Sequence, residues 1–229
     1  MIKHAIRPIT DPSDFLSDWA TLYAKASEAS FFQSPAWIRA WLGGVREIDE
    51  LHRVEVRASG ELVALGVVTV GRRRPPVIGM REAWFHEFGD PKRAAIYPEY
   101  GDLLLRDDAP PEARNAGVTA LIDGIGVLDS AVFRNLAPGL ADAVRCAAQD
   151  HGLGVRILRE QPVFTCELKA EPFVETLSKS LQTKIRRACK LYQERGALTA
   201  GLAATPEDRL AAWNDLKRLH GVAWRARGQ

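Results

Sequence analysis

The sequence has few cysteines, and those few lie far apart. Cys146, Cys166 and Cys189 are the only three in 229 residues, and no two of them form a C-x-x-C pair. An odd number of scattered cysteines disfavours both a disulfide framework and a structural zinc site. We therefore expect buried thiols without a chemical role, and no bound metal.

Long apolar runs are also missing. The longest mostly apolar run, Leu62 to Val70, is far shorter than the roughly 20 residues that a membrane-spanning helix needs. The N-terminal segment MIKHAIRPI lacks the apolar stretch of a secretory signal. These two absences predict a cytoplasmic protein without a membrane span.

The excess of charge of one sign is small. The chain has 31 Lys and Arg against 29 Asp and Glu, which gives a formal net charge of +2. This balance disfavours a protein that coats nucleic acid with its whole surface, so any attraction for anions must be local. With 46% hydrophobic residues, the chain has ample material for one well-packed core.

Strand and helix patterns alternate along the first part of the chain. Asp11-Pro12-Ser13-Asp14 and Ser34-Pro35 are helix-start signals, and Ser59-Gly60 is typical of a hairpin turn. The patterns up to residue 105 predict, in order, a strand over 5–9, helices over 11–27 and 35–44, a hairpin of 52–58 with 61–70, and strands over 82–88 and 100–105.

The same alternation continues to residue 169. It predicts a helix over 111–128, a strand over 131–135, a helix over 139–151, and strands over 153–158 and 163–169. Strands that alternate with helices favour an α/β fold, in which helices cover the faces of a mixed or partly parallel sheet. We expect residues 1–169 to form one domain of this class.

A basic helix follows over residues 177–196, with six Lys and Arg side chains against the single acid Glu194. At about 100 degrees per residue, Leu177, Leu181 and Ile185 share one arc, and the basic side chains lie largely opposite. Two interpretations remain open: the basic face binds an anion, or it is the solvated face of a linking helix. The candidate anion-binding residues are Lys179, Arg186, Arg187 and Lys190.

The end of the chain repeats a pattern from its beginning. DPSDFLSDWATL from Asp11 and TPEDRLAAWNDL from Thr205 share Pro, Asp, Leu, Trp and Leu at equivalent positions. Convergence of two amphipathic helices explains this, and so does a duplicated domain. The last helix carries Trp213 and Trp224 on an apolar side that needs a core to cover it.

Four stretches together resemble one known family. FFQSPAWIRAW (31–41), EYGDLLL (99–105), SKSLQTKIRRACKLYQERG (178–196) and LKRLHGVAWRARG (216–228) resemble the CelD-like acetyltransferases of the GNAT superfamily. Like the FemABX peptidyltransferases, these proteins consist of two tandem GNAT-like domains. The resemblance implies a first GNAT-like domain over 1–169, a basic linking helix over 170–196, and the opening strand and helix of a truncated second GNAT-like domain over 197–229. The chain is then expected to be the N-terminal portion of a longer protein.

The resemblance also implies an activity. GNAT enzymes transfer an acetyl or other acyl group from acyl-CoA to an amine, and members of this group are associated with exopolysaccharide or cell-envelope precursor biosynthesis. The superfamily's coenzyme-binding signature, Q/R-x-x-G-x-G/A, is not found: Arg134 to Gly139 has the wrong spacing, and Gly124 to Gly126 lies within a predicted helix. We therefore expect acetyl-CoA to be bound mainly by a C-terminal domain, and this chain to be incomplete for catalysis, with its catalytic residues unknown.

Other candidate groups are weaker. His86-Glu87 could supply a base or a metal ligand, or simply a hydrogen-bonded histidine; Glu99 and Asp102 could flank a site or form a polar strand edge. His151 lies near a predicted helix C-terminus, where a favourable contact with the helix dipole explains a histidine without any functional role. Two other functions stay open, namely a non-catalytic interaction domain that uses the last helix, and a nucleic-acid-binding module that uses the basic helix.

Overall fold

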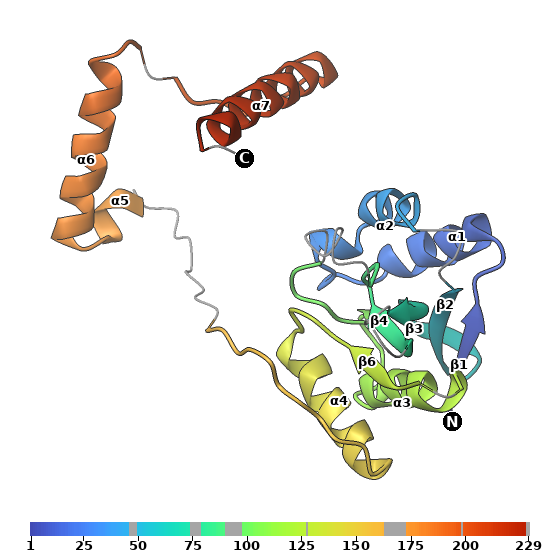
Figure 1. Cartoon of the computed structure of the whole chain (residues 1–229). Coiled ribbons are helices and arrows are strands. Elements are labelled where there is room, and N and C mark those ends of the chain that lie inside the picture. Colours follow the sequence, from blue (N-terminus) through green and yellow to red (C-terminus); the bar gives the residue numbers. More distant parts are fainter. Residues whose placement is uncertain are drawn as a thin grey trace. The chain divides into compact units, whose positions relative to one another are not determined.

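The structure is a computed structural model, and it describes residues 1–45, 50–73, 79–89, 98–126, 128–162, 173–197 and 199–227 (Figure 1). The chain forms two compact units, Met1–Arg159 and Glu160–Gln229. Every strand in the described ranges belongs to the first unit. None of the helices in these ranges is both long enough and apolar enough to cross a bilayer.

A six-stranded mixed sheet forms the centre of the first unit. Its strands are β1 (Ile2–Pro8), β2 (Glu50–Ala58), β3 (Glu61–Arg73), β4 (Met80–Phe85), β5 (Leu104–Leu105) and β6 (Ser130–Val132). Their order is β1-β2-β3-β4-β6, with β5 paired to β3. Neighbours from β1 to β4 are antiparallel, whereas β4 and β6 are parallel. The predicted α/β class, a mixed sheet flanked by helices, is confirmed.

Helices cover both faces of this sheet. Helices α1 (Pro12–Tyr23) and α2 (Pro35–Leu42), with the 3-10 turn η1 (Phe31–Gln33), lie over one face, and α3 (Ala113–Gly124) and α4 (Pro138–Asp150) lie over the other (Figure 1). The predicted caps start the first two helices, since the Asp11 carboxylate accepts from the Ser13 N–H at 2.7 Å and the Ser34 hydroxyl accepts from the Trp37 N–H at 3.2 Å.

Two apolar clusters hold these layers together. On the α1–α2 face the buried side chains include the aromatic rings of Phe15, Trp19, Trp41 and Phe88 together with Ile38 and Leu65, all less than 5% exposed. On the α3–α4 face, side chains of β2 and β3 such as Val54 pack against residues of both helices. Burial of this apolar surface is the main favourable contribution to folding of the unit.

The hairpin between β2 and β3 forms as predicted. Ser59 and Gly60 have positive φ angles of 51° and 91°, which gives the two-residue turn the twist that joins antiparallel strands. The long strand β3 pairs with β2 along one edge and with both β4 and β5 along the other. It is therefore the most enclosed strand of the sheet.

Two predicted strands differ from the structure. Residues 153–158 form no strand, and their apolar side chains Leu153, Val155 and Ile157 are about half exposed. Alternating apolar residues make a strand only where a neighbouring strand offers hydrogen-bond partners. The predicted strand over 163–169 lies outside the described residues. Of the strand predicted over 100–105, Leu104–Leu105 pairs with β3 and Gly101 forms an isolated parallel bridge with Leu136, whereas Tyr100 takes a positive φ of 56°.

The second unit consists of helices in its described part. These are α5 (Phe173–Thr176), α6 (Lys179–Gln193) and α7 (Pro206–Ala226). At the start of α7, the Thr205 hydroxyl accepts from the Asp208 N–H at 3.1 Å, and the Asp208 carboxylate accepts from the Thr205 N–H at 3.3 Å. A strand is predicted over 198–203; its described residues, 199–203, form none, and no strand lies beside them in the described part of this unit. That residues 197–229 open a second domain stays a prediction.

Candidate functional site

The carboxyl ends of the parallel strands β4 and β6 bring two charged residues together. Strand β4 ends at Phe85 and is followed by His86 and Glu87, and strand β6 ends two residues before Arg134. A nitrogen of the Arg134 guanidinium lies 3.3 Å from Oε2 of Glu87. Ligands of open α/β sheets bind at the carboxyl ends of parallel strands. This pair is therefore the centre of the candidate site.

Glu87 is a carboxyl group with unusual proton affinity. The residue is 3% exposed, and its Oε1 atom has no hydrogen-bond partner among the described residues. Burial raises the pKa of Glu87 from its ordinary 4.5 to about 7, although the neighbouring Arg134 guanidinium lowers that pKa. A carboxyl with this pKa takes up and releases a proton near neutral pH, which is what general acid–base chemistry requires.

His86 is held neutral beside this carboxyl. Its backbone has a positive φ of 54°, and its N–H donates to the Val67 carbonyl at 3.0 Å. The ring stacks on Phe85, with 4.0 Å between centroids, and approaches Trp19 edge-on at 5.8 Å. Burial lowers the pKa of His86 from 6.5 to about 3. His86 is thus the neutral, aromatic neighbour of Glu87 and too weak a base to act at pH 7.

The turn that carries both residues is fixed by contacts with β3 and β4. The Thr69 hydroxyl on β3 donates to the Glu87 carbonyl oxygen. At Gly89 the φ angle is +63°, and an added Cβ would lie 2.2 Å from Cδ2 of Trp84. Only glycine fits this close approach without displacing the Trp84 ring. The position of the Glu87 carboxyl is therefore set by packing rather than by a free loop.

A separate open cleft of about 490 Å³ lies next to the segment that follows β6, and neither Glu87 nor Arg134 is among its lining residues. Its walls come from the chain between α1 and α2, from residues 100–111, and from the start of α3. The Gly101 N–H donates to the Asn135 carbonyl at 2.7 Å, and the Ala137 N–H donates to the Gly101 carbonyl at 2.9 Å. These two bonds hold the segment around Gly101, which belongs to one wall of the cleft, next to residues 135–137, which follow Arg134.

An ion pair between Asp102 and Arg114 forms part of the cleft wall. Nη2 of Arg114 donates to Oδ2 of Asp102 at 2.8 Å. Nε of Arg114 lies 3.0 Å from the same oxygen and 3.1 Å from Oδ1. The buried Gln33 amide donates to the Asp102 carbonyl at 3.2 Å. Of the two acids proposed from the sequence to flank a site, Asp102 lines the cleft, whereas Glu99 is exposed and is not among the lining residues.

The loop before α3 does not fit the pyrophosphate of acetyl-CoA. Pyrophosphate sites offer free backbone N–H groups at a helix N-terminus and no competing negative charge. Here Pro110 and Pro111 have no N–H, the Ala113 N–H already donates to the Pro110 carbonyl at 2.9 Å, and three acids occupy the same loop. These acids are Asp107, Asp108 and Glu112.

The two glycine-containing segments considered as coenzyme loops have structural roles. An added Cβ at Gly124 would lie 2.0 Å from Cγ2 of Ile6, so this glycine permits α3 to approach β1. The segment from Arg134 to Gly139 supplies the Glu87 counterion and pairs with Gly101, and Arg114 lies against Gly139. No acetyl-CoA contact is assigned to either segment.

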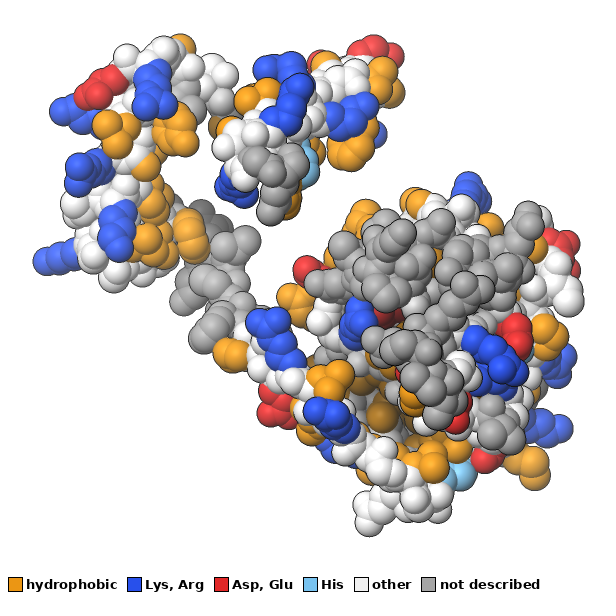
Figure 2. Space-filling model, viewed as in Figure 1, with side chains coloured by type: hydrophobic (Ala, Val, Ile, Leu, Met, Phe, Trp, Pro, Cys, Tyr) orange, Lys and Arg blue, Asp and Glu red, His pale blue; other side chains and the backbone are white. Residues whose placement is uncertain are grey.

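The basic side chains proposed from the sequence as an anion site all lie exposed on α6 in the second unit (Figure 2). These residues are Lys179, Arg186, Arg187 and Lys190. Arg186 donates to the side-chain oxygen of Gln182 at 3.4 Å, and within the described ranges none of the four forms an ion pair with an acid. Their anion-binding role stays a prediction, and the solvated linking helix stays its alternative.

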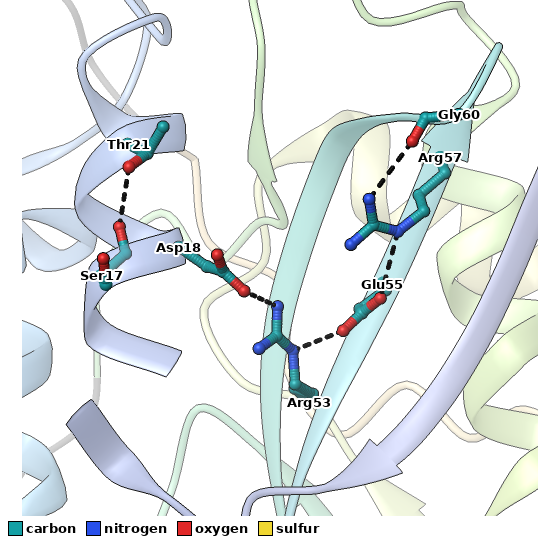
Figure 3. Close-up of polar contacts among 7 residues, drawn as sticks. All are labelled: Ser17, Asp18, Thr21, Arg53, Glu55, Arg57 and Gly60. Atoms are coloured by element: carbon teal, nitrogen blue, oxygen red, sulfur yellow. Dashed lines mark hydrogen bonds and ion pairs between the residues drawn. The ribbon is translucent and has the colours of Figure 1, made fainter. Parts of the chain in front are cut away.

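A cluster of charged side chains lies between α1 and β2, with Arg53 and Glu55 largely buried and Asp18 and Arg57 nearly half exposed. Figure 3 shows Arg53 between the carboxylates of Asp18 and Glu55, with Arg57 reaching from Glu55 to the Gly60 carbonyl. The Arg53 distances are 2.6 Å to each acid, and Arg57 lies 3.4 Å from Glu55. The alternation of Arg, Glu and Arg on one face of β2 signals this cluster in the sequence. Its charges compensate one another, so it links the helix to the sheet.

His151 behaves as expected from its place at the end of a helix. Its Nδ1 lies 2.7 Å from the Ala147 carbonyl, and its Nε2 lies 3.0 Å from the Asp123 carboxylate. The hydrogen bond to Ala147 and then the Asp123 carboxylate raise the pKa of His151.

The two cysteines in the described residues are free thiols. Cys146 is exposed, contrary to the prediction of a buried thiol, and Cys189 is half-buried. Cys166 lies outside the described residues. In the described parts of the chain, no three His, Cys, Asp or Glu side chains gather as a metal site would require.

The sequence did not indicate that Arg134 pairs with Glu87 or that Arg114 pairs with Asp102; Arg134 was considered only as the start of a coenzyme loop. Each arginine is distant in the sequence from its carboxylate, and no local pattern marks either one. The sequence marked this region only through two acids. Glu87 follows a histidine in a stretch rich in aromatic residues, and Asp102 lies in the EYGD stretch.

Among known proteins, the chain is similar to solved structures at low sequence identity. No protein-family model matches the sequence, and no curated protein matches it either. A solved structure of a ribosomal-protein-alanine N-acetyltransferase from Brucella melitensis biovar Abortus 2308 is 13% identical, with a TM-score of 0.41, over 72% of this chain and 100% of that one. A transcriptional regulator from Bacillus halodurans C-125 is also 13% identical, with a TM-score of 0.39, over 72% of this chain and 100% of that one. Likenesses this weak decide no activity, so the functional conclusion rests on the site's own residues.

Proposed function

We propose that this chain is part of a GNAT-like N-acyltransferase, which transfers an acetyl or other acyl group from acyl-CoA to an amine. The order β1, α1, α2, β2, β3, β4, β5, α3, β6, α4 supports the proposal, because it follows the implied order of a strand, two helices, a run of strands, a helix, a strand and a helix. Of the two strands that this order places next, the one expected over 153–158 is not formed. The observation that carries it is Glu87, a carboxyl group with a pKa of about 7 at the carboxyl ends of the two parallel strands.

Transfer to an amine requires a group that accepts a proton near pH 7. An amine acceptor is mostly an ammonium ion in neutral water, and its nitrogen attacks only after it loses a proton. The ionised Glu87 carboxylate accepts that proton and becomes the neutral acid, while Arg134 keeps the ionised form available. Because both forms of Glu87 are populated near neutral pH, the proton is then released to water.

The acyl donor is proposed to bind elsewhere. The acids and prolines of the loop before α3 do not fit a pyrophosphate, so no acyl-transfer step is assigned to that loop. A C-terminal domain, as the resemblance implies, would hold acetyl-CoA, with the basic residues of α6 as candidate contacts to its phosphates. The acceptor would be an amino sugar or a related precursor of an exopolysaccharide or of the cell envelope, and the protein would act in the cytoplasm.

Release of the coenzyme thiol from acetyl-CoA, measured with a panel of amines on the longer protein that includes the proposed C-terminal domain, tests this function; the 229-residue chain alone is expected to release none. We expect Glu87→Gln to lower the rate at least about 100-fold, the usual contribution of a general base. Glu82→Gln is the matched control, since Glu82 lies on the adjacent strand β4 and is equally buried, at 4% exposed. Circular dichroism shows whether each variant is folded. An unchanged rate for folded Glu87→Gln contradicts the base role, and thiol release with no amine contradicts acyl transfer to an amine.

One observation favours a second function, a non-catalytic interaction domain. The apolar side chains of α7 are between 40% and 61% exposed, and they include Trp213 and Trp224. Exposed aromatic side chains in such numbers are typical of surfaces that bind another protein. A stable complex formed through α7 by a protein that releases no thiol from acetyl-CoA would favour this function over catalysis.

A further inference from the structure

Strand β4 stops pairing with β3 just before the candidate site. Phe85, the last residue of β4, lies opposite Val68 of β3, and antiparallel pairing carried two residues further would place Glu87 opposite Gly66. This place on β3 is occupied, because β5 pairs with the two residues of β3 just before Gly66, and a Cβ added at Gly66 would lie 2.6 Å from Cδ2 of Leu103. The chain after β4 therefore turns away from the ladder.

The turn that follows brings Glu87 back over β3. His86 takes a positive φ of 54°, and the Glu87 carbonyl oxygen accepts a hydrogen bond from the Thr69 hydroxyl. Thr69 lies three residues along β3 from Gly66, a distance of about 10 Å. We infer that Thr69 is a positioning residue for Glu87: its hydroxyl holds the turn that keeps the carboxyl buried beside Arg134. The inference rests on the proposed function only in taking Glu87 to be the proton acceptor.

Thr69 is a hydroxyl group in an apolar row. Side chains alternate along a strand, so Thr69 points to the same face of β3 as Leu65 and Val67, which belong to the apolar cluster under α1 and α2. Thr69 is 0% exposed, and a buried hydroxyl without a partner is unfavourable. Glu87, 3% exposed, likewise has a carbonyl oxygen that requires a donor. Each group satisfies the other, and valine in place of Thr69 would remove this donor.

The carboxyl of Glu87 depends on this main-chain anchor. Positive φ angles occur at His86 and at Gly89, on either side of Glu87, and a turn of this kind keeps its shape only through its contacts. Among the described residues, the groups beside the carboxyl are the Arg134 guanidinium at 3.3 Å and the neutral ring of His86. Without the Thr69 bond the turn relaxes, water reaches the carboxyl, and its proton affinity falls.

A carbon-13 NMR titration of the Glu87 carboxyl in the full 229-residue chain tests the inference. Thr69→Val replaces the hydroxyl by a methyl group of similar size, so the proton affinity of Glu87 should fall at least about tenfold, which is one pKa unit. Thr69→Ser keeps the hydroxyl and should titrate as the unmodified chain does. Thr21→Val is the matched control, since it removes the same kind of bond, from the Thr21 hydroxyl to the Ser17 carbonyl at 2.9 Å, at an exposed position of α1.

A bond that only stabilises the sheet would give a different result. Thr69→Val would then unfold at a lower urea concentration, while its folded form would titrate at Glu87 as before, and this outcome overturns the inference. A shift in Thr69→Ser as large as that in Thr69→Val overturns it as well. One measurement needs no variant: in the unmodified chain the bonded Thr69 hydroxyl should give a proton signal that exchanges slowly with water. Absence of this signal would also overturn the inference.

The proposed function is judged by a separate measurement. The titration uses neither an acyl donor nor an amine, so it concerns only how Glu87 is held. In the longer protein, Thr69→Val should move the acid limb of the pH–rate profile for thiol release to lower pH, because the limb follows the carboxyl. A shifted titration in Thr69→Val, together with no thiol release by the longer unmodified protein, supports the role of Thr69 and contradicts the proposed function.

Discussion

The carboxylate of Glu87 and the guanidinium of Arg134 meet 3.3 Å apart, although 46 residues and an entire helix separate them in the sequence. The parallel pairing of β4 with β6 is what brings the two together. The buried carboxylate thus pairs with a guanidinium whose side chain is 45% exposed.

Removal of this counterion should raise the proton affinity of Glu87. In Arg134→Gln the positive charge that lowers the pKa of Glu87 is gone, while burial of the carboxyl remains, so its pKa should rise above about 7. A carbon-13 NMR titration of the carboxyl measures this directly. Arg145→Gln, which alters an exposed ion pair on α4, is the control and should leave the Glu87 titration in place. A Glu87 pKa that stays the same in Arg134→Gln would show that Arg134 is not its counterion.

Glu87 should make the protein less stable as the pH rises. Its folded pKa of about 7 exceeds its ordinary value of 4.5, so the folded state favours the protonated carboxyl. The stabilisation is fully present below pH 4.5 and is lost as the pH rises to 7, by up to about 3 kcal/mol. Urea unfolding at a series of pH values should show this decline in the unmodified chain and not in Glu87→Gln. Parallel curves for the two proteins would contradict the assignment.

His86 should act in the opposite direction. Its folded pKa of about 3 lies below its ordinary 6.5, so the folded state favours the neutral ring. Its contribution to stability is present above pH 6.5 and is lost as the pH falls towards 3. His86→Asn should remove this acid-side loss, and asparagine tolerates the positive φ at this position. His151→Asn, at an exposed histidine, should leave the loss unchanged. A His86→Asn protein with the same acid-side slope would be the contrary result.

The Trp19 ring nitrogen should matter more than that of Trp41. Both rings are buried, but Trp19 donates to the Gln33 carbonyl at 2.7 Å, whereas Nε1 of Trp41 has no partner among the described residues. Trp19→Phe leaves the buried carbonyl of Gln33 without this donor and should cost about 1–3 kcal/mol more than Trp41→Phe. Because both changes remove the same atoms, the comparison isolates the hydrogen bond. Equal costs in urea unfolding would refute its importance.

Local features of the fold were predictable from the sequence. The caps at Asp11, Ser34 and Thr205 and the turn at Ser59-Gly60 involve residues only two or three positions apart. Their geometry follows from the residue types themselves, whatever the rest of the chain does. Together with the alternation of strand and helix patterns, they were sufficient to predict the α/β class.

Features that depend on distant partners were not predictable in the same way. The alternating apolar residues of 153–158 have the pattern of a strand, yet a strand forms only where another strand pairs with it. His86-Glu87 was noticed in the sequence, but its meaning depends on Arg134 and on burial, and both come from tertiary packing.

The pairing of β1 with β2 has a consequence for how the protein is made. All seven residues of β1 have their partners in β2, from Ile2 opposite Ala58 to Pro8 opposite His52. During synthesis the first strand leaves the ribosome well before its partner, and only the segment of α1 and α2 follows it directly. The sheet residues that cover α1 and α2, namely Leu65, Val67 and Leu104, emerge later still, and until then a chaperone on the nascent chain would find its binding surface on the apolar faces of these helices.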